Sequence, residues 1–131
     1  MKRLHKRSRG TSIVETIAGL FILIPLLLAL VDVAVAVLAQ TANDAMCKSA
    51  ARAAAESQNV GQAEAAAQTA VDRFPAAGYI ISKGRPQVTY NPNVSVRVIT
   101  EITWRPPVQI PFSPRDLRFV TDVTEPVVGT L

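Results

Sequence analysis

The sequence predicts an α+β protein in which a long N-terminal helix carries a small antiparallel sheet. Three observations lead to this fold class. Residues 17–39 are almost entirely apolar, the stretch that follows to about residue 58 is rich in alanine, and apolar and polar side chains alternate in much of 79–123. The first two features are typical of helix and the third of strands with one buried face. A chain of 131 residues has room for one small domain beyond the apolar run.

Basic residues are concentrated at the N-terminal end, where five of the 14 Lys and Arg side chains lie within the first nine residues. The remaining nine are outnumbered by the ten Asp and Glu, so the net charge of +4 comes from this leader. A basic cluster before an apolar segment keeps the N-terminus cytoplasmic and directs the rest of the chain outward. We therefore expect a lipid bilayer as a partner and no nucleic acid.

The apolar run is long enough to cross a membrane. Residues 17–39 contain Asp32 as their only ionisable side chain, and at about 1.5 Å per residue they span roughly 35 Å against a hydrocarbon core of about 30 Å. If the helix instead enters the membrane at Thr11, it leaves near Leu30. Asp32 then lies at the outer headgroup level, either as an interface residue or as a contact to another subunit.

The predicted helix continues beyond the membrane as a stalk, so that residues 12–57 form one helix. Pro25 removes a backbone donor and should kink the spanning part. In the stalk, polar residues recur every four positions, with Asp44–Lys48 and Arg52–Glu56 as candidate pairs. Small side chains on the other surface permit close packing, within the chain or against neighbouring copies.

A second, shorter helix should follow the stalk. Asn59-Val60-Gly61 has the composition of a helix end, with Gly61 available for a left-handed cap. Beyond it one face is apolar and Pro75 ends the helix; the members of that face are Ala63, Ala66, Ala67, Ala70, Val71 and Phe74.

The last part of the chain should form three or four short antiparallel strands. Candidates are 79–82, 87–90, 94–104 and a segment containing Leu117, Phe119 and Val123. Asn91-Pro92-Asn93 is a turn sequence, and four prolines in 105–114 make that segment a surface loop or edge. So small a sheet can bury a core only against a helix.

Glu15 is the most informative single residue. A carboxylate just inside an apolar helix is costly at membrane depth, which implies a partner for it. Cleavage after Gly10 would create an α-amine on Thr11, and the same amine on a neighbouring copy could neutralise Glu15.

A basic leader, Gly10, and Glu15 ahead of an apolar helix resemble the class III signal of type IV pilins and pseudopilins. The run Gly10 to Glu15, with Pro25 and Asp32 in the helix, most resembles the TadE-like family of tight-adherence pilus proteins.

The resemblance implies a minor pilin or pseudopilin. It would be processed by a prepilin peptidase after Gly10 and assembled, through Glu15, with other pilin-like subunits on the pilus assembly platform. Adhesion or secretion would be the role of that pilus. The expected organisation is a leader at 1–10, a transmembrane helix at 11–39, a stalk at 40–58, and a periplasmic or extracellular domain at 59–131, anchored in the bacterial inner membrane.

We expect no enzymatic activity, cofactor or metal. The only histidine, His5, lies in the leader, and serine nucleophile elbows, phosphate-binding glycine loops and paired cysteines are absent from the sequence. The only cysteine, Cys47, lies on the stalk, where a disulfide to another subunit and a buried thiol are both open alternatives.

Two other functions fit the same N-terminal region. An exported binding protein would be cut by signal peptidase after Ala36 or Ala39, where small residues occupy suitable positions. That alternative requires an unusually long apolar core and gives Glu15 no role. The other is an uncut single-pass anchor that carries a periplasmic interaction domain.

Overall fold

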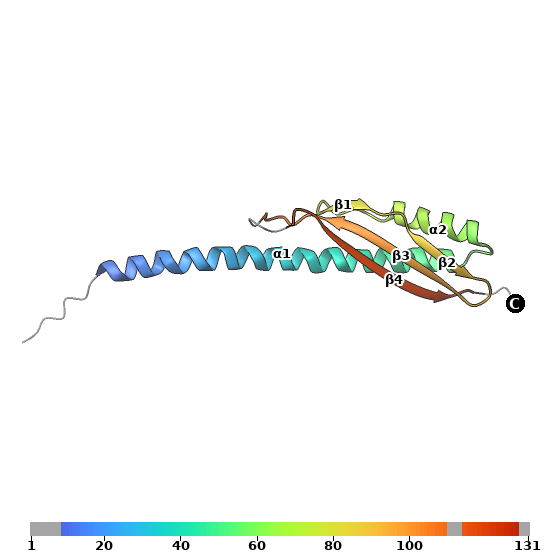
Figure 1. Cartoon of the computed structure of the whole chain (residues 1–131), viewed down its shortest axis with the longest axis horizontal. Helices are drawn as coiled ribbons and strands as arrows, with labels where there is room; N and C mark the ends of the chain where they lie inside the picture. Colours follow the sequence, from blue (N-terminus) through green and yellow to red (C-terminus); the bar gives the residue numbers. More distant parts are fainter. Residues whose placement is uncertain (1–8, 110–113, 129–131) are drawn as a thin grey trace, which may run out of the picture.

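The computed structural model describes residues 9–109 and 114–128 and confirms the predicted α+β fold. Most of the leader and four residues of the proline-rich segment, 110–113, lie outside these described residues. The elements in chain order are α1 (Arg9–Ala55), α2 (Val60–Arg73), β1 (Ile80–Lys83), β2 (Gln87–Asn91), β3 (Ser95–Trp104) and β4 (Leu117–Pro126). Figure 1 shows that the C-terminal part of α1 lies alongside the other elements, while its N-terminal part projects away from them.

The long helix α1 is one continuous element of 47 residues, as the apolar and Ala-rich segments predicted. Pro25 lies inside it, and the helix continues through this residue. The helix ends at Ala55, two residues before the predicted end.

The second helix, α2, runs antiparallel to the stalk and packs its small residues on it. Its buried positions are Ala63, Ala67 and Val71, all on the predicted face, and Phe74 before Pro75 caps its end. The expected role of Gly61 was wrong: Asn59 is the N-cap of α2, its side chain accepting from the Gln62 N–H at 2.9 Å, and Gly61 lies in the first helical turn. Asn is a preferred N-cap because its side-chain oxygen satisfies an otherwise unpaired backbone donor.

The sheet is built around β3. Strand β4 pairs antiparallel with β3 along its whole length, from Ser95↔Pro126 to Trp104↔Leu117. Because a strand has only two edges, β1 and β2 share the other edge in tandem, with β2 on Ser95–Ile99 and β1 on Ile102–Trp104. The turn from Asn91 to Val94 joins β2 and β3, and Asn93 has a positive φ of 60°.

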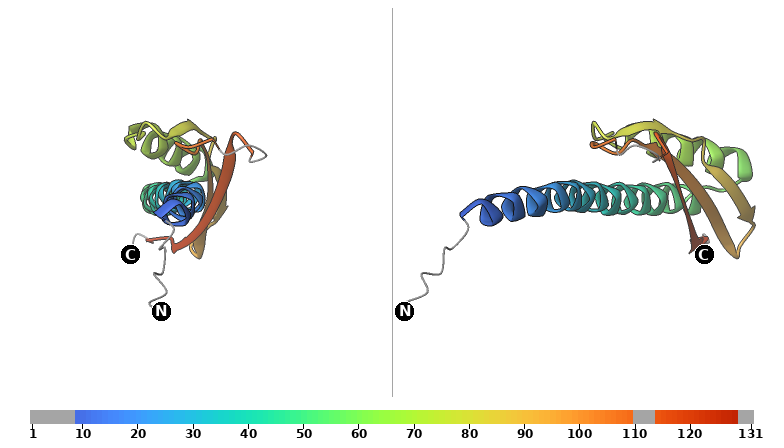
Figure 2. Two further views of the ribbon diagram at one scale, coloured as in Figure 1. Left: turned by 90° about the vertical axis from the view of Figure 1, so that its left-hand side faces the viewer. Right: turned by 60° about the vertical axis from the view of Figure 1, so that its left-hand side comes forward.

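The core lies between the two helices and one face of this sheet. In Figure 2 the end-on view shows α1 lying in the angle between α2 and the curved sheet. The inward residues of β3 are Val96, Val98, Thr100, Ile102 and Trp104, and they alternate with more exposed residues as the sequence predicted. From α1 the core receives the fully or almost fully buried side chains of Ala39, Met46, Cys47, Ala50, Ala51 and Ala54. Part of the small-residue surface of the stalk therefore packs within the chain, whereas Ala45 and Ser49 are exposed.

Candidate functional site

The projecting half of α1 is apolar and exposed over its entire surface. By length and composition it could span a membrane or act as a signal anchor. At this end of the helix the large side chains are between 39% and 77% exposed, and they include Ile13, Val14, Ile17, Leu20, Phe21, Ile22, Leu23, Ile24, Leu26, Leu27, Leu28 and Leu30. A helix that is apolar on all sides requires an apolar environment, either lipid or other protein.

The expected processing and assembly residues lie at the start of this half. Gly10 and Thr11 belong to the first turns of α1, and Glu15 is exposed one turn further on. None of the three ion pairs among the described residues includes Glu15. Two of them, Arg97–Asp122 and Arg118–Glu101, join β3 to β4, and the third, Arg105–Asp116, joins the residue after β3 to the residue before β4.

Asp32 lies where α1 meets the end of the sheet. It is half-buried, and its Oδ1 accepts a hydrogen bond from the Val108 N–H at 3.0 Å. The sequence predicted an interface residue or a subunit contact, but it gave no sign of this link across 76 residues. The carboxylate thus fixes the loop after β3 at one level of the helix.

An apolar pocket of about 280 Å³ adjoins Asp32. The side chains that line it come from α1, from β3 and its loop, and from β4: Ala29, Asp32, Val33, Ala36, Trp104, Pro106 and Leu117. Trp104 stacks on Phe119 with ring centroids 5.8 Å apart. Its indole Nε1 is buried and has no hydrogen-bond partner among the described residues.

A polar seam that the sequence analysis missed joins α1 to the sheet. Asn43 is fully buried; its Nδ2 donates to Phe119 O and Thr121 Oγ1, and its Oδ1 accepts from Thr100 Oγ1 at 2.9 Å. Asp44 also accepts from Thr121 Oγ1, at 2.7 Å. The sequence did contain a signal for Thr100. This residue lies two residues from both Val98 and Ile102, so the alternation along the strand places it on the same inward face.

The candidate pairs along the stalk do not form. Asp44 accepts from Gln40 and Thr121 and makes no ion pair with Lys48, and Arg52 makes none with Glu56, among the described residues. A spacing of four residues advances about 40° around a helix at each step. The polar residues at this spacing therefore change their surroundings along the helix. Gln40 and Asp44 face the sheet, whereas Lys48, Arg52 and Glu56 are exposed to solvent.

Cys47 is fully buried beneath the sheet, as in the second of the two alternatives. Its Sγ lies 3.2 Å from Val98 O and 3.5 Å from Thr121 O. Burial raises the pKa of this thiol above its ordinary value. A disulfide to another subunit would require α1 to separate from the sheet.

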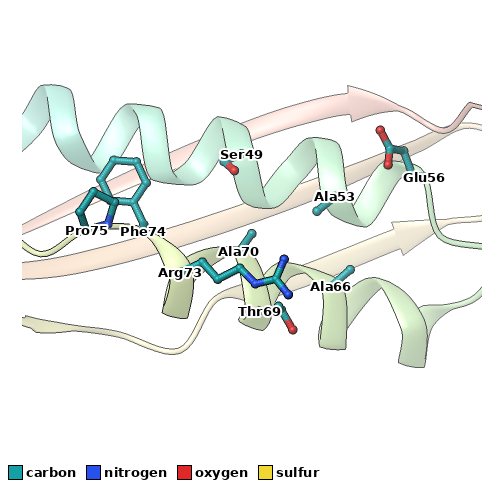
Figure 3. A pocket seen from close by; sticks show the side chains of 9 residues that line it. All are labelled: Ser49, Ala53, Glu56, Ala66, Thr69, Ala70, Arg73, Phe74 and Pro75. Atoms are coloured by element: carbon teal, nitrogen blue, oxygen red, sulfur yellow. The ribbon is translucent and has the colours of Figure 1, made fainter.

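A second pocket, of about 550 Å³, lies between α1 and α2. Figure 3 shows small side chains such as Ala53 and Ala70 between Glu56 at one end and Phe74 with Pro75 at the other, with Arg73 extending along α2. The pocket contains no histidine or cysteine. Within residues 9–109 and 114–128, no three His, Cys, Asp or Glu side chains are placed to hold a metal ion.

Comparison with models of protein families, with curated proteins and with solved structures found no match for this chain.

Proposed function

We propose that this chain is a TadE-like minor pilin or pseudopilin that contributes to assembly of a tight-adherence type IV pilus. A prepilin peptidase cuts it between Gly10 and Thr11. The apolar half of α1 lies in the bacterial inner membrane with its N-terminus cytoplasmic, and the sheet with α2 lies in the periplasm until the subunit joins a pilus.

The observation that carries the proposal is the division of α1 into two halves with different surroundings. One half is apolar on all sides and bears Glu15 near its start, and the other half is the central helix of the domain core. A rigid helix of this kind can move from lipid into a bundle of similar helices while the domain keeps its fold. This arrangement, together with the Gly10–Glu15 spacing, suits a subunit that is stored in a membrane and then assembled.

The packing of α1 argues against an exported protein cut after Ala36 or Ala39. Ala39 is fully buried, and Val35 and Ala36 pack against the core. Asp32 holds the loop at Val108. Cleavage after Ala39 would remove all of these contacts from the mature domain, and cleavage after Ala36 would remove all of them except that of Ala39.

The mass of the intact mature chain, extracted from membranes, tests the proposal. A start at Thr11 is expected. A start at Val37 or Gln40 would identify an exported domain, and an intact Met1 would identify an uncut anchor. Either of these two results contradicts prepilin processing.

Two variants should show that cleavage and assembly depend on different residues. Gly10→Val should accumulate a precursor about ten residues longer, because the peptidase needs a small residue at the cut. Glu15→Ala should still be made, cut and membrane-bound, yet be absent from sheared pili, because the α-amine of Thr11 on its neighbour loses its counter-charge. Glu64→Ala, which removes an exposed carboxylate from α2, is the matched control. Normal amounts of the Glu15 variant in pili would contradict the pairing.

A further inference from the structure

One end of the domain lies close to the level at which α1 would leave the membrane. Figures 1 and 2 show that the start of β1 and the loop that follows β3 form the end nearest the projecting half of α1. The two segments are joined by the Arg105 N–H, which donates to Tyr79 O at 3.1 Å. We call residues 79–81 and 105–108 together the foot of the domain.

The foot is held at a defined height on the helix. The hydrogen bond from Val108 N–H to Asp32 Oδ1 fixes the loop beside Asp32. From Thr11 to Asp32 the helix rises about 32 Å, at 1.5 Å per residue, which is close to the thickness of the hydrocarbon core. The foot therefore lies near the outer boundary of a bilayer that α1 enters at Thr11.

Exposed apolar side chains on α1 beyond Asp32 indicate that the outer boundary of the membrane lies further toward the domain. Val33, Val37 and Leu38 lie beyond Asp32 and are 60%, 60% and 55% exposed. Leu38 is about 9 Å beyond Asp32 along the helix axis. A membrane that ended at Asp32 would leave these three side chains in water, whereas one that covers them brings the foot into the headgroup layer.

The surface of the foot has the chemistry of that layer. Ile81 is 48% exposed, Tyr79 is half-buried, and Pro107 is exposed. Arg105 uses Nε in its 3.0 Å ion pair with Asp116 and has further N–H donors on its guanidinium group. Aromatic, aliphatic and arginine side chains are favoured where acyl chains give way to phosphates.

We propose that the foot rests among the phospholipid headgroups of the outer leaflet of the membrane that α1 crosses. This inference depends on the membrane insertion included in the proposed function. Contact with lipid at the foot sets the depth and tilt of the domain before assembly. At the same level, the hydrogen bond from the Val108 N–H provides the Asp32 carboxylate with a donor inside the protein.

A fluorescent label placed at the foot tests the contact. The full chain with Ile81→Cys is labelled with a nitrobenzoxadiazole dye and reconstituted in vesicles of phosphatidylcholine and phosphatidylglycerol that carry a spin-label quencher on the headgroup. Val94→Cys is the matched control, because Val94 is also an exposed aliphatic residue and lies in the turn at the other end of the sheet. The native Cys47 is fully buried, and the unsubstituted chain supplies the labelling blank. Quenching is expected at position 81 and not at position 94.

Three results would overturn the inference. No quenching at position 81, in protein that resists alkaline extraction, would show that the foot stands clear of the lipid or is covered by a second copy while α1 remains inserted. Equal quenching at both positions would mean that the domain lies flat. Release of the protein by alkali would contradict both the inference and the membrane insertion included in the proposed function.

The charge of the foot supplies a second test. In the same vesicles Arg105→Glu should reduce the quenching at position 81, because it replaces a cation beside anionic lipid with an anion. Arg97→Glu is the control, since Arg97 forms a surface ion pair with Asp122 near the start of β3, at the end of the sheet away from the foot. Equal effects of the two variants would exclude a specific role for Arg105.

Discussion

At the scale of single residues, the side chain of Asn43 bridges α1 and the sheet with all of its hydrogen bonds inside the protein. Asn43→Leu should destabilise the domain by about 1–3 kcal/mol, because it leaves the Thr100 hydroxyl and Phe119 O buried without this partner. The free energy of unfolding in urea, measured in detergent, checks this. Thr41→Ala, at an exposed position of the same helix, should have little effect.

A double substitution distinguishes the contribution of the Asn43–Thr100 hydrogen bond from that of simple packing. Asn43→Leu with Thr100→Val removes both partners of one bond and should cost less than the sum of the two single changes. Strict additivity would mean that the two side chains do not act together.

The thiol of Cys47 should be protected from alkylation in the folded chain, because it is fully buried and its pKa is raised by burial. The unfolded chain ionises this thiol at its ordinary value of 9.0, whereas the folded chain retains the proton to higher pH. The group therefore contributes no pH dependence below that value, and stability falls as the pH rises through it. Cys47→Ala should remove this alkaline loss, which urea unfolding across that pH range would measure. Rapid labelling of the native protein, or a disulfide-linked dimer, would contradict the buried state.

At the scale of elements, α2 is fastened at both ends by side chains. Asn59 caps its start, and the Lys83 ammonium donates to Val71 O at 2.7 Å and to Phe74 O at 2.9 Å at its end. A cation at a helix C-terminus also interacts favourably with the helix dipole. Lys83 thereby links β1 to the last turn of α2.

Lys83→Met keeps the aliphatic stem and removes these bonds, so we expect a loss of about 1–2 kcal/mol in the free energy of unfolding. Amide hydrogen exchange should accelerate first in the last turn of α2. Lys48→Met, on the exposed side of α1, provides the control. Equal losses in both variants would show that the effect is one of charge alone.

The elements were predictable from the sequence to the extent that local pattern determines them. The alternation placed Val96, Val98, Ile102 and Trp104 on the inward face of β3, since period two is a property of the strand itself; it also placed Val94 there, which lies before the strand and is 67% exposed. Gly61 was assigned to the wrong helix end because Asn59 and Gly61 both suit a junction, and only the direction of the Asn59 side chain decides which helix is capped. The Asp32–Val108 bond and the partners of Asn43 depend on where distant segments meet, which no local pattern records.

At the scale of the whole molecule, residues 32–39 of α1 belong both to its apolar run and to the packing of the domain. Asp32 holds the loop, Val35 and Ala36 pack against the core, and Ala39 is fully buried in it. Residues 32–39 therefore contribute both to the apolar run, which could span a membrane, and to the packing of the domain.

This overlap predicts the behaviour of shortened chains. A chain that begins at Gln40 loses Ala39, Val35 and the Asp32 hydrogen bond, whereas one that begins at Ala29 keeps all three. The first should unfold at a temperature lower by on the order of 10 °C, since each kcal/mol lowers the Tm of a domain of this size by about 4–8 °C. Thermal unfolding of both chains in the same detergent measures the difference. Equal Tm values would show that the helix before Gln40 is only an anchor, which would also remove the structural argument against an exported protein.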